Sequence, residues 1–303
     1  MDDAALVRPD ARDGVALVLT IDVITPIVDD PRAFGEIAAA NSLSDVYAMG
    51  GKPQVALSFI GFPNDRLPLS VLEEVMAGVR EACARARCAI VGGHTISDAE
   101  PKCGLAVVGA VDPAKAWTHR SARAGDVLVL TKPLGTGIIG QALKAGGASA
   151  AMIEQATRRM CELNDVARDI GVELGASSGT DVTGFGLLGH LKHMVEASDT
   201  SAEIRSAAVP LLEGTLELAA EGKVPGGSRR NLGYAAPVTE FAEGVSEAMR
   251  LVLADAQTSG GLLLSLAPDR ADEAVKRLRD AGREAAVIGA LGSAGVGPRI
   301  RVT

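Results

Sequence analysis

Apolar and polar positions alternate along the chain with two different spacings, and each spacing predicts a different kind of element. Residues 34–49 carry apolar side chains three and four positions apart and are followed by Gly50 and Gly51, which predicts a helix that stops there. Ser70 and Glu73 have the spacing of a capping box, which predicts the start of a second helix. Short apolar runs with strand character lie at residues 14–22, 55–60, 88–91 and 104–111.

The second half of the chain repeats this alternation with longer helical patterns and more glycine. Strands are predicted at residues 126–131, 285–288 and 300–302, and helices at residues 148–171 and 270–281. Glycine-broken loops are predicted at residues 177–189 and 224–231. The mixture predicts an α/β or α+β fold. The polar stretch 112–124 predicts a boundary between two domains, residues 1–112 and residues 113–303.

Charge and cysteine content narrow the choice of partners and compartment. The 303 residues include 38 acidic and 30 basic side chains, a net charge of -8, so a broad basic surface for nucleic acid is excluded. The longest apolar run near the start is shorter than the roughly 20 residues that cross a bilayer, and it is not part of a signal peptide, so no membrane association is expected. Four cysteines are too few for a disulfide framework, which favours the cytoplasm.

Carboxylates on the predicted strand and helix faces are the first candidates for chemistry. Asp22 interrupts an apolar strand, and Asn41 and Asp45 interrupt the apolar face of the helix at 34–49. That helix contains no Lys or Arg that could pair with Asp45. Either Asn41 and Asp45 form a solvated edge, or they belong to a metal or ligand site. We favour the site, because an uncompensated carboxylate on an apolar face is costly.

Asp181 is a second acidic candidate, because it precedes a run of closely spaced glycines in the segment TDVTGFGLLGH. Such glycines allow backbone to approach a ligand closely. Asp181 either caps the helix that follows or binds a ligand. Separated aspartates with few histidine or cysteine neighbours are typical of sites for a hard ion such as Mg²⁺, which commonly bridges carboxylates to nucleotide phosphates.

Two glycine-containing segments are possible phosphate sites, and the sequence retains one of them and excludes the other. Residues 91–97, VGGHTIS, follow a strand, so His94 and Thr95 lie either in a plain turn or in a turn whose amides bind a phosphate or ribose. The segment GTGIIG at 135–140 matches the dinucleotide fingerprint, yet no second strand ending in an acidic residue follows it. The chain also lacks a complete P-loop. A Rossmann-type site is therefore excluded.

The cysteines give little reason to expect thiol chemistry. Cys83 belongs to an apolar helix stripe and Cys88 begins a strand, so both are predicted to be buried and inert. Cys103 follows a lysine and is the one thiol with an expected exposed, electropositive setting.

Basic and imidazole side chains outside these segments are weaker candidates. His190 and His193 are one helical turn apart with no third ligand nearby, which predicts a surface helix rather than a metal site. Arg229 and Arg230 follow two glycines and either grip a phosphate or lie in a solvated loop.

Seven segments spread over nearly the whole chain carry a family resemblance. They are DDAAL (2–6), the long block 20–53 that begins TIDVITPIVDDP, VGGHTISDAEPKCGLAVVGAV (91–111), LTKPLGTG (130–137), TDVTGFGLLGHL (180–191), VPGGSRRN (224–231) and DAQTSGGLLL (255–264). In this order they resemble the selenophosphate synthetase (selenide, water dikinase) family. The long block and TDVTGFGLLGHL are the most specific.

The resemblance implies an enzyme with the two-domain fold of the aminoimidazole ribonucleotide synthetase-like superfamily, which thiamine-monophosphate kinase shares. It implies a homodimer formed through the N-terminal domains. The implied reaction converts ATP, selenide and water into selenophosphate, phosphate and AMP, with Mg²⁺ as the cofactor. The residues that match the family's metal ligands are Asp3, Asp45 and Asp181, and those that match its nucleotide contacts are Asp2, Asp22, Asp45, His94, Thr95 and Ile96.

One part of the family's pattern has no counterpart in the printed chain. The family carries a glycine-rich segment with a catalytic Cys or selenocysteine and an essential Lys upstream of DDAA, whereas this sequence opens at Met1-Asp2-Asp3. None of the four cysteines matches that motif, so no catalytic residue is assigned. We therefore expect the printed chain to be inactive or impaired, and we expect an upstream coding segment. The alternatives are a catalytically dead nucleotide-binding partner, or another enzyme of the superfamily acting on a ribonucleotide or thiamine phosphate.

Overall fold

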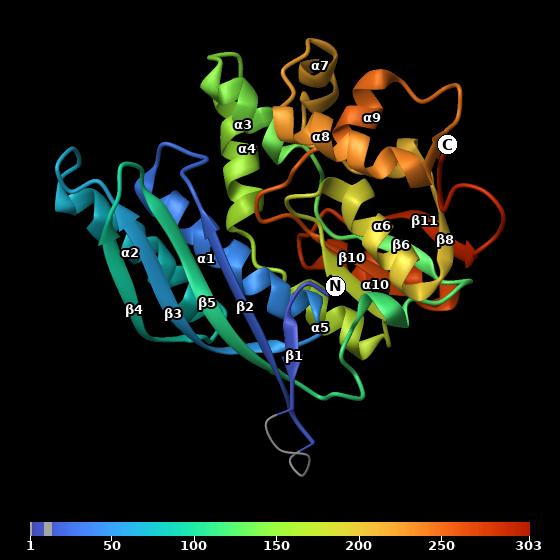
Figure 1. The fold of residues 1–303 in the computed structure, drawn as a ribbon, viewed down its shortest axis with the longest axis horizontal. Coiled ribbons are helices and arrows are strands. Elements are labelled where there is room, and N and C mark those ends of the chain that lie inside the picture. The colour runs from blue at the N-terminus through green and yellow to red at the C-terminus, as the bar shows by residue number, and fades with distance from the viewer. Residues whose placement is uncertain (1, 9–13) are drawn as a thin grey trace. The chain divides into compact units, whose positions relative to one another are not determined.

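The structure is a computed structural model that describes residues 2–8 and 14–303. Contacts divide the chain into two compact units (Figure 1). The N-terminal unit comprises Asp3–Ala116 and Thr157–Asp165, and the C-terminal unit comprises Asp2, Trp117–Ala156 and Val166–Thr303. Both units combine a mainly antiparallel sheet with helices, which confirms the predicted mixed α/β class. In the described ranges, none of the helices has both the length and the apolar character that a membrane crossing requires.

The N-terminal unit is built on a sheet whose described strands have the order β1-β2-β5-β3-β4. These strands are β1 (Ala5–Val7), β2 (Ala16–Ile24), β3 (Lys52–Phe62), β4 (Ala89–Ser97) and β5 (Lys102–Val111). The pair β3–β4 is parallel and the other pairs are antiparallel. Helices α1 (Pro31–Ala48) and α2 (Leu69–Arg85) lie along one face of the sheet (Figure 1). Ala16 and Val18 of β2 are buried on that face, whereas Leu19 and Ile21 are exposed on the other.

The helix starts show how local sequence sets the ends of these elements. Helix α1 begins three residues before the prediction, because Asp30 accepts a hydrogen bond from the Ala33 amide at 2.6 Å and Pro31 occupies the first turn. The predicted capping box of the second helix is wrong. Helix α2 follows Pro68, which has an extended backbone, and Ser70 lies inside its first turn without capping it.

The C-terminal unit is built on a sheet whose described strands have the order β7-β10-β6-β11-β8-β12-β9. These strands are β6 (Val127–Leu130), β7 (Ser178–Asp181), β8 (Thr200–Ile204), β9 (Thr239–Phe241), β10 (Leu262–Leu266), β11 (Ala286–Ser293) and β12 (Ile300–Val302). Its core is aliphatic, and Leu262, Leu263 and Leu264 of β10 are fully buried. The remaining helices are α3 (Thr136–Lys144), α4 (Ala150–Cys161), α5 (Asp165–Glu173), α6 (Gly186–Ser198), α7 (Thr215–Ala220), α8 (Gly226–Ala235), α9 (Glu247–Leu253) and α10 (Pro268–Asp280).

Three predictions about this half of the chain are wrong in their local structure. The helix predicted at 148–171 is two helices, α4 and α5, and the break contains Asn164, whose amide donates to the Ser44 hydroxyl at 2.9 Å. The loop predicted at 177–189 contains β7 and the start of α6. The loop predicted at 224–231 is mostly the start of α8, because Pro225 precedes the two glycines and supplies a helix-compatible N-terminus.

Candidate active site

A polar cluster lies between strand and helix in the N-terminal unit. Thr20 and Asp22 are two positions apart on β2, and Asn41 and Asp45 are four positions apart on α1, so each pair shares one face of its element. The Thr20 hydroxyl donates to Asp45 Oδ2 at 2.5 Å, and the Asn41 amide donates to Asp22 Oδ2 at 2.8 Å. The structure therefore joins two predicted site residues, Asp22 and Asp45, to the same strand–helix contact.

Burial sets the electrostatics of this cluster. Burial raises the pKa of Asp22 above its ordinary value, and the hydrogen bond from Asn41 opposes that rise without cancelling it. The side chain of Asn41 is only 6% exposed, so the solvated-edge interpretation is wrong for Asn41. A partly desolvated carboxylate gains free energy from a cation, which is the behaviour expected of a metal or nucleotide site.

His94, Thr95 and Ile96 lie in a strand, whereas both alternatives drawn from the sequence placed them in a turn. They belong to β4, where His94 pairs with Phe59 and Thr95 with Ile60. The strand continues beyond residue 91 because β3 supplies a parallel partner along its whole length. His94 is in register with Val23 through Gly104 and Phe59, which places it on the open face of the sheet, opposite Asp22.

Distance also separates these residues from the polar cluster. Strands β5 and β3 lie between β2 and β4, and strand spacings of about 4.8 Å put His94 roughly 14 Å from β2. One copy of the N-terminal unit therefore does not bring His94, Thr95 or Ile96 together with Asp22 and Asp45.

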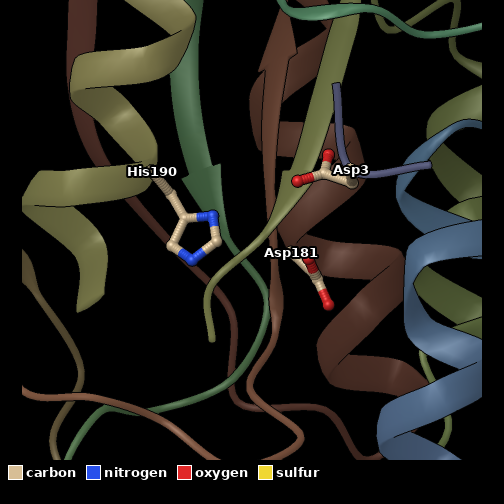
Figure 2. A group of neighbouring side chains, drawn as sticks. All are labelled: Asp3, Asp181 and His190. Carbon is tan, nitrogen blue, oxygen red and sulfur yellow. The ribbon is translucent and has the colours of Figure 1, made fainter. Parts of the chain in front are cut away.

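In the C-terminal unit, Asp181 is the last residue of β7 and is 1% exposed (Figure 2). Its backbone pairs with Leu262 of β10. The chain then turns through residues 182–185 and enters α6 at Gly186, which has φ +68°. A side chain at Gly186 would meet the Ala254 carbonyl carbon at 2.6 Å, so this sharp entry requires glycine.

His190 is buried against this turn, so its prediction as a surface residue is wrong. It is 6% exposed and lies on the inner side of α6 (Figure 2). Its Nε2 accepts the Thr183 amide at 3.1 Å, and a ring nitrogen lies within 4.8 Å of an Asp181 carboxylate oxygen. His193, one turn later, is half-buried, and its Nε2 lies 2.9 Å from the Tyr234 hydroxyl.

Gln257, to which sequence reasoning assigned no role, holds the Asp181 turn to the start of α3. Its backbone amide donates to the Thr183 carbonyl at 2.9 Å. Its side-chain Oε1 accepts the Gly135 and Thr136 amides at 2.9 and 3.1 Å. These amides are among the unpaired donors of a helix N-terminus, so Gln257 caps α3 from a distant segment.

Asp255 also contributes to the hydrogen bonds around the start of α3. It is fully buried and accepts hydrogen bonds from Ser228 Oγ at 2.7 Å, the Ile138 amide at 3.1 Å and Gln257 Nε2 at 3.0 Å. Burial raises the pKa of Asp255 to about 6, against the opposing hydrogen bonds from Ser228 and Ile138. Asn231 completes the network by donating to the Gly184 carbonyl at 2.8 Å. The sequence signal for these residues was their place in the segments VPGGSRRN and DAQTSGG, which carry the family resemblance.

The remaining predicted acidic residues lie near the start of the chain. The Asp2 carboxylate accepts the His119 amide at 2.8 Å within the C-terminal unit. Asp3, also drawn in Figure 2, and Asp45 belong to the N-terminal unit, whereas Asp181 belongs to the C-terminal unit. Asp22 and Asp45 share one cluster, and Asp181 has its own setting around His190.

The predicted setting of Cys103 is wrong, and the arginines have a different setting from the loop expected. Cys103 is 1% exposed on β5, and burial raises the pKa of its thiol to about 12, so it is not a reactive thiolate. Cys83 and Cys88 are buried free thiols, as predicted. Arg229 and Arg230 are exposed on α8.

Comparison with known proteins decides the family. Two family models match, the AIR synthase related protein N-terminal domain over residues 1–111 and the C-terminal domain over residues 123–298. A selenide, water dikinase of Carboxydothermus hydrogenoformans is 45% identical over 290 residues, which are 96% of this chain and 83% of that protein. One of Myxococcus xanthus is 46% identical, covering 95% of this chain and 82% of that protein. The chain belongs to the selenide, water dikinase family.

Solved structures confirm that the fold of this selenide, water dikinase family member extends to more distant proteins. Thiamine-monophosphate kinase from Stenotrophomonas maltophilia K279a matches with a TM-score of 0.72 at 21% identity, covering 99% of this chain and 89% of that one. The hydrogenase maturation protein HypE matches with a TM-score of 0.72 at 22% identity, covering 99% and 88%. At these identities the likeness establishes the two-domain AIR synthase-like fold, as predicted, and no more.

Proposed function

We propose that this protein makes selenophosphate, converting ATP, selenide and water into selenophosphate, phosphate and AMP. The observation that carries the proposal is the identity of 42–46% to selenide, water dikinases over nearly the whole chain. A half-buried carboxylate at Asp22 and a fully buried one at Asp181, both at positions that match the family, support it. The two superfamily relatives known by fold alone, at about 21% identity, give no comparable support for a ribonucleotide or thiamine phosphate as substrate.

We propose Mg²⁺ as the cofactor, with Asp3, Asp45 and Asp181 as its ligands. The donor set fits a hard cation, because carboxylate oxygens are the ligands that Mg²⁺ prefers. Asp181 contributes a fully buried carboxylate and Asp45 a half-buried one. Bound there, the ion would neutralise negative charge on the transferred phosphoryl group.

The chain's own residues would bind and orient the nucleotide. Asp22 is fixed by Asn41, and Asp45 by Thr20, so their carboxylates are held in place before ATP arrives. Asp2, Asp22, Asp45 and the strand segment His94, Thr95 and Ile96 are the proposed nucleotide contacts. Since His94 lies on the open face of the sheet, its contact with nucleotide is proposed to depend on a second copy of the chain.

A homodimer is proposed through that open face. Its side chains are apolar and exposed, with Ile21 at 65%, Leu57 at 50% and Val23 at 39%. Ile21, Ala106 and Leu57 are paired in register across β2, β5 and β3, so the patch is continuous. A contiguous exposed apolar patch of this kind marks a protein interface. The reduced state of the four free cysteines is consistent with the proposed cytoplasmic location.

Product analysis tests the reaction. Phosphorus NMR of a mixture of protein, ATP, Mg²⁺ and selenide should show selenophosphate and selenide-dependent AMP. ADP formed with a ribonucleotide or thiamine monophosphate would instead identify another reaction of the superfamily. Intact binding of ATP without turnover would favour the nucleotide-binding partner.

A further inference from the structure

Both ring nitrogens of His190 contact the two residues that flank the Asp181 turn. Nε2 accepts the backbone N–H of Thr183 at 3.1 Å. Nδ1 lies 3.3 Å from the hydroxyl of Thr180, and that hydroxyl donates to the Asp181 carbonyl at 3.2 Å. His190 thus contacts one residue before Asp181 and one shortly after it, while being 6% exposed.

The direction of these hydrogen bonds fixes the state of the ring. A backbone N–H can only donate, so Nε2 must carry a lone pair and no proton. In the neutral ring the proton is then on Nδ1, from which it is donated to the Thr180 hydroxyl. Neither nitrogen retains a lone pair for a metal, although one of them lies within 4.8 Å of an Asp181 oxygen. A ligand role for His190 is therefore disfavoured.

The hydrogen bond from the Thr183 amide to His190 links the conformation of the turn to the histidine. The N–H of the half-buried Thr183 donates to the buried Nε2 of His190, which holds the chain direction directly after Asp181, and losing that acceptor destabilises this arrangement of the turn. A turn that lost this bond would shift to find another acceptor. Since Asp181 is only two residues away, its carboxylate would shift with the turn.

We propose that His190 is a positioning residue that holds Asp181 in the orientation required for binding the divalent cation. The inference rests on the proposed function, in which Asp181 is a Mg²⁺ ligand. It adds a residue that the family resemblance left without a role. Such supporting contacts typically change metal affinity 10–100-fold when they are removed.

Two substitutions of His190 separate the contacts. His190→Gln can place its Oε1 near the position of Nε2 and accept the Thr183 amide, whereas the shorter His190→Asn reaches only the position of Nδ1. His193→Asn is the control on the same helix, because its Nε2 lies 2.9 Å from the Tyr234 hydroxyl and it touches the turn through a ring contact with Phe185 rather than through the Thr183 amide that His190 accepts. The measurement is isothermal calorimetry of Mg²⁺ binding in the presence of ATP, together with ATP binding in EDTA.

His190→Asn is expected to weaken Mg²⁺ binding at least 10-fold, His190→Gln less than 3-fold, and His193→Asn not at all. ATP binding in EDTA should be unchanged in all three, which a general loss of structure would not give. If His190→Asn does not fold, Thr180→Val removes the other contact at nearly constant volume and should weaken Mg²⁺ binding several-fold.

Two results would overturn the inference. Wild-type Mg²⁺ affinity in the folded His190→Asn or Thr180→Val protein is one of them. Equal loss in His190→Gln and His190→Asn, with Zn²⁺ bound more tightly than Mg²⁺ by the wild type, would make His190 a ligand instead. Failure of the proposed function looks different, because the wild type itself would then show no Mg²⁺-dependent binding of ATP.

Discussion

The carboxylates of Asp255, Asp22 and Asp45 all accept hydrogen bonds from neutral groups, yet they differ in how far the sequence could identify them. Asp255 accepts three hydrogen bonds from neutral donors and links α3, α8 and the segment before β10. Its sequence context, DAQTSGG, gave no residue-level role. Asp22 and Asp45, in contrast, could be selected from sequence because a charge on an apolar strand or helix is costly in itself. Their pairing with Asn41 and Thr20 could not, since it depends on how α1 packs across β2.

Asp255 gives a pH prediction whose sign follows from its pKa. The folded pKa of about 6 lies above the ordinary 3.8, so between these values the folded state binds more protons than the unfolded state. Stability from this group is present below pH 4 and is lost as the pH rises through about 6. Asp255→Asn should remove this slope, roughly 3 kcal/mol in total.

Urea unfolding of the wild type and of Asp255→Asn between pH 4.5 and 7.5 measures this slope. The difference in unfolding free energy should move in favour of the variant as the pH rises. The variant also loses an acceptor for the Ile138 amide or Ser228 hydroxyl, which lowers its stability by an amount that does not depend on pH. Curves that stay parallel across this range would contradict the assignment.

Element packing explains which parts of the fold the sequence predicted. Helix α1 and strands β2 and β5 follow from apolar spacing and lie close to their predicted bounds, whereas β4 continues well beyond the predicted 88–91. The break between α4 and α5 did not show in the spacing, because Asn164 is fixed by Ser44, a residue distant in sequence. Strand β7 was missed for a similar reason, since it is a short strand that exists through its pairing with β10.

The crossing of α1 and α2 predicts a sharp dependence on two glycines. A Cβ on Gly35 would lie 1.9 Å from the Val75 carbonyl oxygen, and one on Gly78 would lie 2.0 Å from that of Arg32. Either alanine substitution must push the helices apart, so each should lower the free energy of unfolding by about 1–3 kcal/mol. Gly233→Ala in α8 is the matched control, because nothing lies within 4 Å of the added methyl group.

Urea unfolding at constant pH gives these values directly. Gly233→Ala should leave stability unchanged or raise it by up to about 1 kcal/mol, since alanine is the better helix former. Wild-type stability in Gly35→Ala would show that α1 and α2 separate at little cost, and would contradict the close packing.

Because Gln257 caps α3, its substitution is also expected to lower the free energy of unfolding. Gln257→Ala leaves the buried Gly135 and Thr136 amides without their acceptor, so it should cost about 1–3 kcal/mol. Hydrogen exchange of α3, measured by mass spectrometry, should rise more than that of α10. Helix α10 is the reference because it begins at Pro268, whereas the Gln257 side chain accepts amides at the start of α3. Equal exchange in α3 of the variant and the wild type would rule out the capping role.

At the scale of the whole molecule, the open face of the N-terminal sheet accounts for the proposed dimer. The sequence pattern showed the strands but not that both faces of β2 carry apolar side chains, because alternation of buried and exposed apolar residues is invisible in a continuous apolar run. The dimer was predicted from the resemblance, whereas the pattern had already singled out Asp22, Asp45 and Asp181 as site residues.

A charge placed on this face tests the dimer. Ile21→Asp puts a carboxylate at a position that is 65% exposed in one copy and buried in the proposed interface. Sedimentation velocity at tens of micromolar should give a dimer of the 31.0 kDa chain for the wild type and a monomer for the variant. Val296→Asp, at a still more exposed residue of the C-terminal unit, should remain dimeric. A monomeric wild type would reject the interface.

Calorimetric titration of ATP in Mg²⁺ and in EDTA shows directly whether acidic residues of this chain form a divalent-cation-dependent site for ATP. We expect binding at least 10-fold tighter with Mg²⁺, and loss of that difference in Asp45→Asn and in Asp181→Asn. His193→Asn should retain the difference. Equal affinity of the wild type for ATP in Mg²⁺ and in EDTA, or an unchanged Mg²⁺ effect in both aspartate variants, would contradict this expectation.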